Sequence, residues 1–172
     1  MTEHQLEFRK LRLPEDRPVL LLLHEAYDQE YGFIRKPGEY DVLAGYLEKH
    51  QEIYHMFALM EGEQPLGYIR AYERMSTSSC DRVLMFDLLY ILPHARGQKL
   101  GTGMMEHLVA FAQANGNARI DLLVDIDNAP AIRLYQKFGF EGRIRQQMHL
   151  FIHPREDLLA YFHEKKERES RS

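Results

Sequence analysis

The segment from Leu89 to Gly103 contains residue types whose order suits the binding of a phosphate-bearing ligand. An apolar stretch that predicts a strand is followed by a basic, glycine-containing turn and then by a predicted helix. The first N–H groups of a helix lack acceptors within the helix and lie at the positive end of its dipole, and glycine lets an anion approach them closely. Arg96 and Lys99 add full positive charges, so a diphosphate is the natural ligand. The predicted binding residues, here called the basic turn, are Arg96, Gly97, Gln98, Lys99, Leu100, Gly101 and Thr102.

Two other nucleotide-binding motifs compete for the same glycines. The spacing of Gly97, Gly101 and Gly103 is found in some dinucleotide-binding folds, and an acid, Asp121, follows downstream. In those folds the acid ends the second strand, whereas Asp121 lies near the start of its predicted strand. A P-loop requires the string G-x-x-x-x-G-K-[ST], which does not occur in the chain. An ordinary glycine-containing connection stays open as the plain alternative.

Two motifs together resemble the GNAT superfamily of acyl-CoA-dependent N-acyltransferases. The family's R/Q-x-x-G-x-G/A pyrophosphate loop is matched from Arg96 to Gly101, after a family-like strand end. A second stretch, from Asn128 to Phe140, has the family's pattern of asparagine, alanine, tyrosine and glycine-phenylalanine. The resemblance covers about residues 8 to 151, and it implies acetyl-CoA as the cofactor.

The resemblance also implies the fold, which is an α/β (α+β) fold with a mixed, strongly twisted central sheet flanked by helices. Its fourth and fifth strands, here Val83 to Leu92 and Arg119 to Asp125, are expected to splay apart. The pantetheine arm of the cofactor would enter that gap and pair with the main chain near Leu89 and Ile91.

One position departs from the family pattern, because Lys99 stands where the loop usually has its first glycine. We expect the main-chain N–H groups to bind phosphate all the same, provided that residue 99 takes ordinary helical dihedral angles. Two interpretations of the Lys99 side chain stay open: it reaches a phosphate of the cofactor, or it is solvated at the start of the helix.

The second motif lies on a predicted helix that Asn128 caps. Seven residues of helix turn through about 700°, so Asn128 and Tyr135 project from nearly the same side, with Ala131 between them. By resemblance, Asn128 and Ala131 contact the cofactor, and the Tyr135 hydroxyl protonates the CoA thiolate as it leaves. Without the family pattern, Tyr135 would be predicted to be a core aromatic residue.

The acceptor amine must lose a proton before it attacks, because an amine of pKa near 10.4 is almost fully protonated at pH 7. Asp87 is the candidate base: it is a single acid in an apolar strand, and alternation would place it on the face of Leu89 and Ile91. A strand acid that is partly exposed or paired with an arginine is the alternative. Glu73 and Asp125, at the ends of the third and fifth strands, are further candidates.

Residues 25 to 40, which span the first two predicted helices and their connecting loop, are the predicted acceptor-binding region. Acidic and aromatic side chains mingle there, which suits a cationic amine, although a solvated helix face explains the same acids. Arg35 and Lys36 can also bind a carboxylate, so polyamine and amino-acid-like acceptors both stay open. The candidate acceptor-binding residues are Glu25, Asp28 and Tyr31.

Alternating patterns predict the elements that position these residues. Strands are predicted at residues 6–13, 56–60, 66–72, 83–92, 120–124 and 147–152, and helices at 19–27, 42–47, 100–114, 129–138 and 154–162. Residues 1–153 are expected to form the acetyltransferase domain, with residues 154–172 as an amphipathic helix and charged tail of the same domain.

Composition restricts the class of protein. A chain of 172 residues with 45% hydrophobic and 28% charged residues fits one globular domain. The single cysteine, Cys80, excludes a disulfide framework and favours a reducing compartment, so a cytoplasmic location is expected. No apolar run approaches the ~20 residues of a membrane span, and a net charge of -4 argues against a nucleic-acid partner. The nine histidines lack metal-ligand spacing, so no metal is predicted.

The leading hypothesis is an N-acetyltransferase that transfers acetyl from acetyl-CoA directly to a primary amine of a small molecule, in a ternary complex. Cys80 has no evident acid-base partner, which favours direct transfer over a covalent intermediate. Acetylation of a protein or peptide amine and a catalytically silent acyl-CoA-binding regulatory domain are the alternatives. Family habit and the apolar face of the last predicted helix suit a homodimer, and the alternative is that this face covers the sheet.

Overall fold

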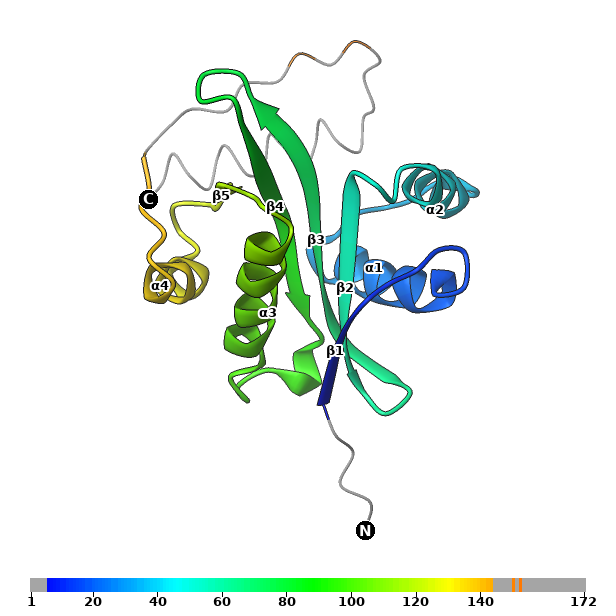
Figure 1. Ribbon diagram of the computed structural model, residues 1–172. Coiled ribbons are helices and arrows are strands. Elements are labelled where there is room, and N and C mark those ends of the chain that lie inside the picture. The colour runs from blue at the N-terminus through cyan, green and yellow to red at the C-terminus, as the bar shows by residue number, and fades with distance from the viewer. Residues whose placement is uncertain (1–5, 144–149, 151, 153–172) are drawn as a thin grey trace. The chain divides into compact units, whose positions relative to one another are not determined.

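The computed structural model describes residues 6–143, 150 and 152 (Figure 1). It divides into two compact units, Met1–Leu123 and Val124–Ser172, and each is described by itself. The last predicted strand, apart from Leu150 and Ile152, and the whole of the last predicted helix lie outside the described residues.

The first unit is built on a five-stranded sheet in the order β1-β2-β3-β4-β5. The first four strands are antiparallel neighbours, and β5 pairs in parallel with β4. This mixed sheet confirms the predicted fold class. The strands are β1 (Leu6–Lys10), β2 (Tyr54–Glu61), β3 (Gln64–Ser76), β4 (Asp81–Ile91) and β5 (Arg119–Leu122).

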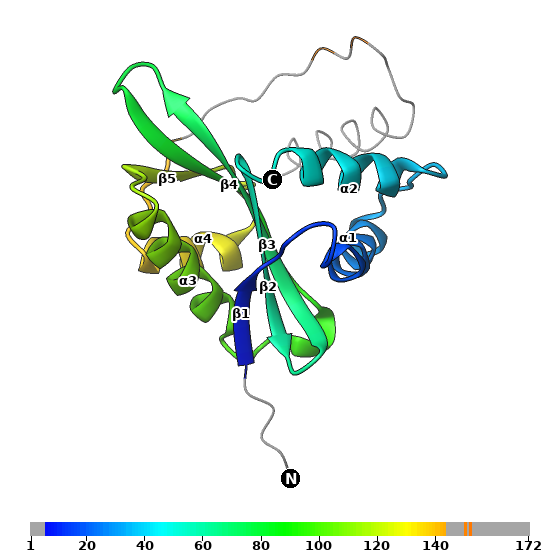
Figure 2. The same cartoon turned by 45° about the vertical axis from the view of Figure 1, so that its right-hand side comes forward.

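Helices cover both faces of this sheet. Figures 1 and 2 show α1 (Arg17–Tyr31) and α2 (Glu39–Lys49) on one face and α3 (Leu100–Ala114) on the other. A short 3-10 turn, η1 (Pro93–Ala95), connects β4 to the basic turn. In the second unit, α4 (Ala129–Lys137) is the described helix.

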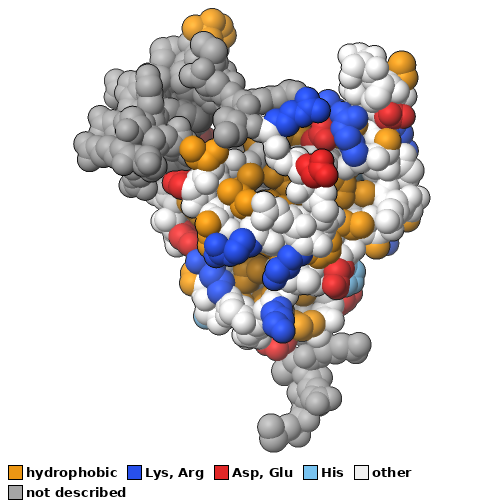
Figure 3. All heavy atoms as spheres, turned by 90° about the vertical axis from the view of Figure 1, so that its left-hand side faces the viewer, with side chains coloured by type: hydrophobic (Ala, Val, Ile, Leu, Met, Phe, Trp, Pro, Cys, Tyr) orange, Lys and Arg blue, Asp and Glu red, His pale blue; other side chains and the backbone are white. Residues whose placement is uncertain are grey.

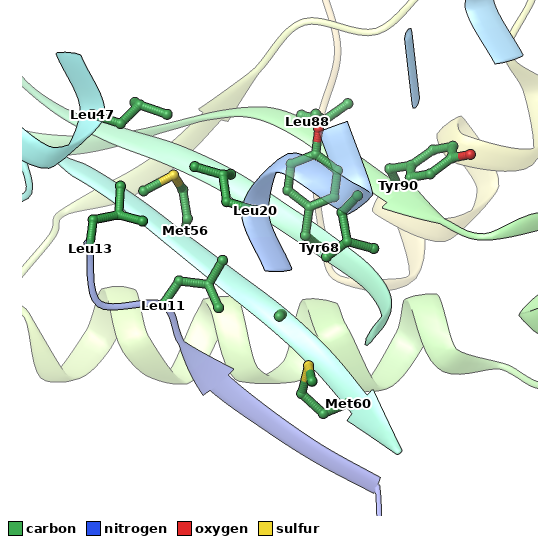
Figure 4. Close-up of a cluster of buried hydrophobic side chains, with 11 residues drawn as sticks. Leu11, Leu13, Leu20, Leu47, Met56, Met60, Tyr68, Leu88 and Tyr90 are labelled. Atoms are coloured by element: carbon green, nitrogen blue, oxygen red, sulfur yellow. The ribbon is translucent and has the colours of Figure 1, made fainter. Parts of the chain in front are cut away.

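The core on the α1 face explains why α1 forms where it does. Leu20, Leu23 and His24 of α1 are all buried, and their spacing of three and four residues marks one side of a helix. They pack beside Tyr68 and the surrounding cluster (Figure 4), so the apolar side of α1 is fixed by the sheet. The cluster consists of Leu11, Leu13, Leu20, Leu23, Leu47, Met56, Ala58, Met60, Tyr68, Leu88 and Tyr90.

An extra residue in β4 interrupts the alternation that the sequence predicts. Leu88 lies opposite Arg70, whereas the next residue of β3, Ala71, lies opposite Phe86, so Asp87 is a β-bulge. The Asp87 carboxylate contacts Arg70, whose side of β3 is opposite to that of Leu89 and its partner Ile69. The expectation that Asp87 shares a face with Leu89 and Ile91 is therefore wrong, because simple alternation does not continue across a bulge.

The pairing of β4 with β5 ends at the same place. It joins Val83–Phe86 to Arg119–Leu122, whereas β4 continues to Ile91. The later half of β4, which includes Leu89 and Ile91, therefore extends past its pairing with β5, as the predicted divergence of these strands requires.

Gly67 lies where β3 approaches this later half of β4. A Cβ atom at residue 67 would lie 2.5 Å from the Tyr90 carbonyl oxygen and 3.1 Å from the Ile91 Cα, both of which belong to the backbone. Gly67→Ala should therefore lower the free energy of unfolding by about 1–3 kcal/mol, as overpacking does in cores. Urea denaturation measures this loss. In Gly45→Ala, the control, the added Cβ meets no atom within 4 Å and lies in a helix, so stability should not fall.

Candidate functional site

The basic turn has a left-handed backbone at two positions. Gly97 has φ 83°, and Lys99, which caps α3, has φ 60° and ψ 15°. The condition that residue 99 takes ordinary helical angles is therefore not met. The left-handed region is one that glycine enters at little cost, which explains why the family has glycine where this chain has lysine. The α3 N-terminus follows directly, so the turn presents its backbone beside the positive end of a helix of 15 residues.

The residues of this turn are accessible where a ligand needs them. Arg96, Gly97, Gln98 and Lys99 are exposed, whereas Leu100 is buried and anchors the start of α3. Arg96 and Lys99 therefore place two exposed positive charges in this turn, although the whole chain carries a net charge of -4. Figure 3 shows Lys and Arg side chains interspersed with Asp and Glu on one face of the molecule. Local positive charge and helix N–H groups together suit an anion.

Arg96 is tied to the end of α1. Its Nη2 donates to Glu30 Oε2 at 2.6 Å, its Nε donates to the Ile91 carbonyl at 2.9 Å, and its guanidinium lies over the Tyr90 ring. The Tyr90 hydroxyl donates to the same Glu30 oxygen at 2.9 Å. These hydrogen bonds, Arg96 first, hold the pKa of Glu30 below its usual range, so Glu30 stays ionised beside the basic turn. The sequence marked Glu30 only as one acid among several.

Asp87, the candidate base, is paired with an arginine. Arg70 Nε lies 3.2 Å and 3.1 Å from the two carboxylate oxygens of Asp87, and the two side chains are 23% and 31% exposed. The structure therefore contains the predicted alternative in which Asp87 is paired with an arginine. Burial opposes the charge of Arg70, but Asp87 outweighs this effect and raises the pKa of Arg70. Sequence reasoning did not single out Arg70, although it alternates with Tyr68 and Tyr72 along one side of β3.

A row of tyrosines accompanies this ion pair. The Tyr46 and Tyr54 ring centroids lie 5.7 Å apart, and those of Tyr54 and Tyr72 lie 5.6 Å apart. Burial raises the pKa of Tyr54, and the hydrogen bond with Tyr46 and the charge of Asp87 add to this effect. The rings of Tyr54 and Tyr72 therefore lie on the same side of the sheet as Arg70, the partner of Asp87.

Asp28 does not serve as a solvent-facing acid for the acceptor. It is 1% exposed, and its carboxylate accepts hydrogen bonds from Arg35 Nε at 2.6 Å, from Arg35 Nη2 at 3.0 Å and from the Tyr40 hydroxyl at 3.2 Å. Burial and these donors occupy both carboxylate oxygens, so the placement of Asp28 does not support its predicted role as an acceptor-binding residue. The ion pair of Asp28 with Arg35 instead holds the loop after α1 to that helix. It also occupies the Arg35 guanidinium, which the sequence offered as a carboxylate-binding group. Glu25 and Tyr31 are exposed, as acceptor contact requires.

His24 is a buried residue that the sequence did not single out. Its Nδ1 lies 2.7 Å from the Tyr68 hydroxyl, and its Nε2 lies 3.9 Å from Asp28 Oδ2. Burial lowers the pKa of His24 to about 4; Asp28 opposes this shift, and Arg70 and Arg35 reinforce it. At neutral pH the imidazole is therefore uncharged and links α1 to the centre of β3.

Glu73, the candidate base on β3, has partners for both of its carboxylate oxygens. Glu73 accepts hydrogen bonds from the side-chain amides of Asn115 and Asn117, and it lies within 3.4 Å of both Arg82 Nη2 and His55 Nε2. These partners come from the end of α3 and from strands beside it. Glu73 therefore holds α3 to the sheet, which leaves Asp87 as the better base candidate in the first unit.

The second unit contains the cofactor motif on α4. Asn128 Oδ1 accepts a hydrogen bond from the Ala131 N–H at 3.2 Å, which confirms the predicted cap. Tyr135 is half-buried, and its ring lies 5.9 Å from that of Phe140. Asp125, the third base candidate, belongs to this unit as well. A joint site that combines Tyr135 with Asp87 stays a prediction, because the two residues belong to separately described units.

Metal-binding and membrane-spanning features are the alternatives to such a site. Within residues 6–143, 150 and 152, no group of three or more His, Cys, Asp or Glu side chains is placed to hold a metal ion. In the same part of the chain, none of the helices combines the length and the apolar character that crossing a membrane requires.

Comparison with known proteins gives the family. The model of the Acetyltransferase (GNAT) family matches residues 20–140. An uncharacterized N-acetyltransferase of Schizosaccharomyces pombe is 24% identical over 144 residues, which cover 82% of this chain and 86% of that protein. The ribosomal protein bS18-alanine N-acetyltransferase of Escherichia coli K12 is 29% identical over 109 residues, which cover 60% of this chain and 74% of that protein.

Solved structures agree in fold. A probable acetyltransferase has a TM-score of 0.75 at 20% identity and covers 87% of this chain and 99% of its own. An aminoglycoside acetyltransferase from an uncultured soil metagenomic sample, in complex with sisomicin, has a TM-score of 0.73 at 14% identity, with 85% and 96% covered. AAC(6')-Iy in complex with the bisubstrate analog CoA-S-monomethyl-acetylneamine has a TM-score of 0.70 at 13% identity. The match covers 86% of this chain and 98% of that chain. The chain belongs to the GNAT acetyltransferase family and is an acyltransferase.

The left-handed lysine predicts a stabilising substitution. Replacing Lys99 by glycine removes the steric cost of φ 60°, so Lys99→Gly should raise the free energy of unfolding by about 1 kcal/mol. Lys99→Ala is the matched control, since it removes the same charge but keeps a Cβ, and it should bring no gain. Urea denaturation of the three proteins measures the difference. Equal stabilities of the glycine and alanine variants would contradict the strained conformation.

Buried His24 predicts an acid-dependent loss of stability. Between pH 6.5 and about 4, the unfolded chain binds a proton at residue 24 that the folded protein does not bind. The free energy of unfolding should therefore fall as the pH is lowered through this window. His24→Gln should make the fall shallower, and His94→Gln, at an exposed position, should not. Urea midpoints at pH 7 to 4 measure the slopes; parallel slopes for wild type and His24→Gln would refute the assignment.

Proposed function

We propose that this protein is an N-acetyltransferase that transfers acetyl from acetyl-CoA directly to a primary amine of a small molecule. The observation that carries the proposal is the basic turn, where two left-handed residues lead into the N-terminus of α3 beside Arg96. The family uses acetyl-CoA, and the motif of this turn resembles the family's pyrophosphate loop. We also propose that residues 1–153 form one domain. The cytoplasmic location and the homodimer stay predictions from the sequence.

The residues of the turn fit the diphosphate of the cofactor. The exposed stretch from Arg96 to Lys99 provides main-chain N–H groups without bulky side chains at Gly97 and Gly101. Arg96 already binds the Glu30 carboxylate in an exposed ion pair, which is the geometry that a phosphate oxygen would need. A diphosphate carries more charge than one carboxylate, so it can take the place of Glu30 on the guanidinium.

The later half of β4 supports a place for the pantetheine arm. The main chain at Leu89 and Ile91 extends beyond the pairing of β4 with β5, which ends at Phe86. Backbone groups on that edge can hydrogen-bond an extended ligand in the way that a neighbouring strand would. When bound, acetyl-CoA supplies an acetyl thioester that an amine can attack.

Asp87 and Tyr135 are the proposed proton-transfer residues. Asp87 accepts the proton of the acceptor ammonium, directly or through water, because a carboxylate has lone pairs beyond those that Arg70 uses. Tyr135 donates its proton to the departing sulfur. Asn128 and Ala131 would line the cofactor on α4, with Asn128 also capping that helix.

The acceptor would contact the α1 face through Glu25 and Tyr31, which are exposed. A small molecule is favoured over a protein because the side chains of Asp87 and its partner Arg70 are only 31% and 23% exposed. Acetylation of a protein amine is the second candidate, and the bS18-alanine acetyltransferase of Escherichia coli is a relative with that kind of acceptor.

A thiol-release assay with acetyl-CoA tests the function against polyamines, amino acids, aminoglycosides and basic peptides. With an accepted amine, Asp87→Asn and Tyr135→Phe should each lower kcat by about 10²-fold or more, which is typical of a lost acid or base. Their affinity for CoA should stay near that of wild type. Asp81→Asn, at the start of the same strand, is the matched control and should leave kcat unchanged.

A second measurement separates the cofactor site from the chemistry. Arg96→Glu combined with Gly101→Glu places two carboxylates in the basic turn, so calorimetric binding of CoA should be lost. Binding that survives this change would refute the cofactor site. Tight CoA binding without thiol release for any amine would instead favour a silent binding domain.

A further inference from the structure

We propose that the acceptor is a small amino-carboxylate, whose ammonium group pairs with Asp87 and whose carboxylate pairs with Arg70. This inference rests on the proposed function and names the substrate class of the same site. It makes Arg70 a specificity-determining residue, a role that the sequence left open for Arg35 and Lys36.

The first step is the charge balance at the β4 bulge. Arg70 Nε and Nη2 both lie 3.1 Å from Asp87 Oδ2, so the carboxylate is already neutralised. A simple cationic amine therefore finds little net negative charge there. If it displaced Arg70, the guanidinium would lose its carboxylate while it is only 23% exposed, which is unfavourable.

An amino-carboxylate avoids that loss. Its ammonium can take the place of the guanidinium beside Asp87, while its carboxylate accepts the two parallel N–H groups of Arg70. Each of the four charges then keeps a partner of opposite sign. The exchange conserves the neutrality of the site, so no charge is left unpaired at the half-buried position.

Two other arginines near this face are engaged elsewhere. Arg35 is held by buried Asp28 through two hydrogen bonds. Arg96 is held by Glu30 and belongs to the proposed cofactor site. Arg70, by contrast, is paired with Asp87, which is the candidate base.

The tyrosine row suits the ammonium end of such an acceptor. The rings of Tyr54 and Tyr72 lie 5.6 Å apart and are half-buried on the Arg70 side of the sheet. Ring faces attract an ammonium group, and a partly desolvated site eases the loss of its proton. Burial raises the pKa of Tyr54, and the charge of Asp87 contributes to the same shift.

The exchange also activates the base. Once the acceptor carboxylate binds Arg70, Asp87 no longer shares its lone pairs with the guanidinium and can accept a proton from the ammonium. The freed amine nitrogen forms a bond with the acetyl carbon, and the carbon–sulfur bond breaks. The thiolate takes a proton from Tyr135 or from water, and the proton that the nitrogen loses as it becomes an amide returns to Tyr135 or to solvent. A carboxylate on the acceptor should therefore improve kcat as well as KM.

The test compares matched acceptors with the wild-type enzyme in the thiol-release assay. Free amino acids are compared with their amides, in which the carboxylate is neutral, and with diamines of similar length. We expect kcat/KM for the best amino acid to exceed that for its amide by about tenfold or more, the effect of a hydrogen-bonded charged group. In Arg70→Gln the ratio should fall to within about twofold, as for a weak surface contact.

Arg74→Gln is the matched control, because Arg74 is on the same strand and the same side and has its own carboxylate partner, Asp121. It should keep the wild-type ratio. Amides, diamines or peptides that are acetylated as fast as amino acids by the wild-type enzyme would overturn the inference and leave the proposed function standing. If no amine is acetylated although CoA binds, both are overturned. The comparison of amino acids with amides uses the wild-type enzyme, so it tests the inference even if the Arg70 variant does not fold.

Discussion

The register shift in β4 is the constraint on which the rest of the structure depends. One extra residue, Asp87, lets Leu88 and Tyr90 enter the core under α1, while Leu89 and Ile91 turn to the opposite face. Without it, every side chain beyond residue 87 would point to the other face of the sheet. The parallel pairing with β5 ends at Phe86, one residue before the bulge. The same position therefore ends the pairing of β4 with β5 and begins the segment that is proposed to pair with the cofactor.

The parts of this arrangement that depend on adjacent residues could be predicted from the sequence. The strand, basic turn and helix from residue 83 onward, and the Asn128 cap of α4, are encoded by apolar periodicity, glycine and capping residues within a few positions of one another. Such signals are local, so a single chain reveals them. The bulge could not be predicted, because it is set by how β4 aligns with β3, and the alternation around Asp87 looks regular in the sequence.

The ion pairs escaped prediction for a related reason. Sequence shows which residues carry charge but not which charges meet, and Arg96 meets Glu30 across 66 positions of chain. Asp28 looked like a solvent-facing acid among acids, yet its place on the buried side of α1, four residues after His24, puts it in the core. The sequence did contain a signal for Arg70. A charged residue between two tyrosines on one side of β3 is costly to bury unless it has a partner of opposite charge.

The ion pairs near α1 are of two kinds: a buried pair that stabilises the fold, and an exposed pair in which a ligand can replace one partner. Asp28 with Arg35 is buried, and breaking it would leave an unpaired carboxylate in the core, so it is a fixed part of the loop after α1. Glu30 with Arg96 is 29% and 45% exposed, and exposed pairs contribute only about 0–1 kcal/mol. A ligand anion can therefore displace Glu30 without unfolding anything. Glu30 would keep the hydrogen bond that the Tyr90 hydroxyl donates to it, so the end of α1 would stay attached to β4.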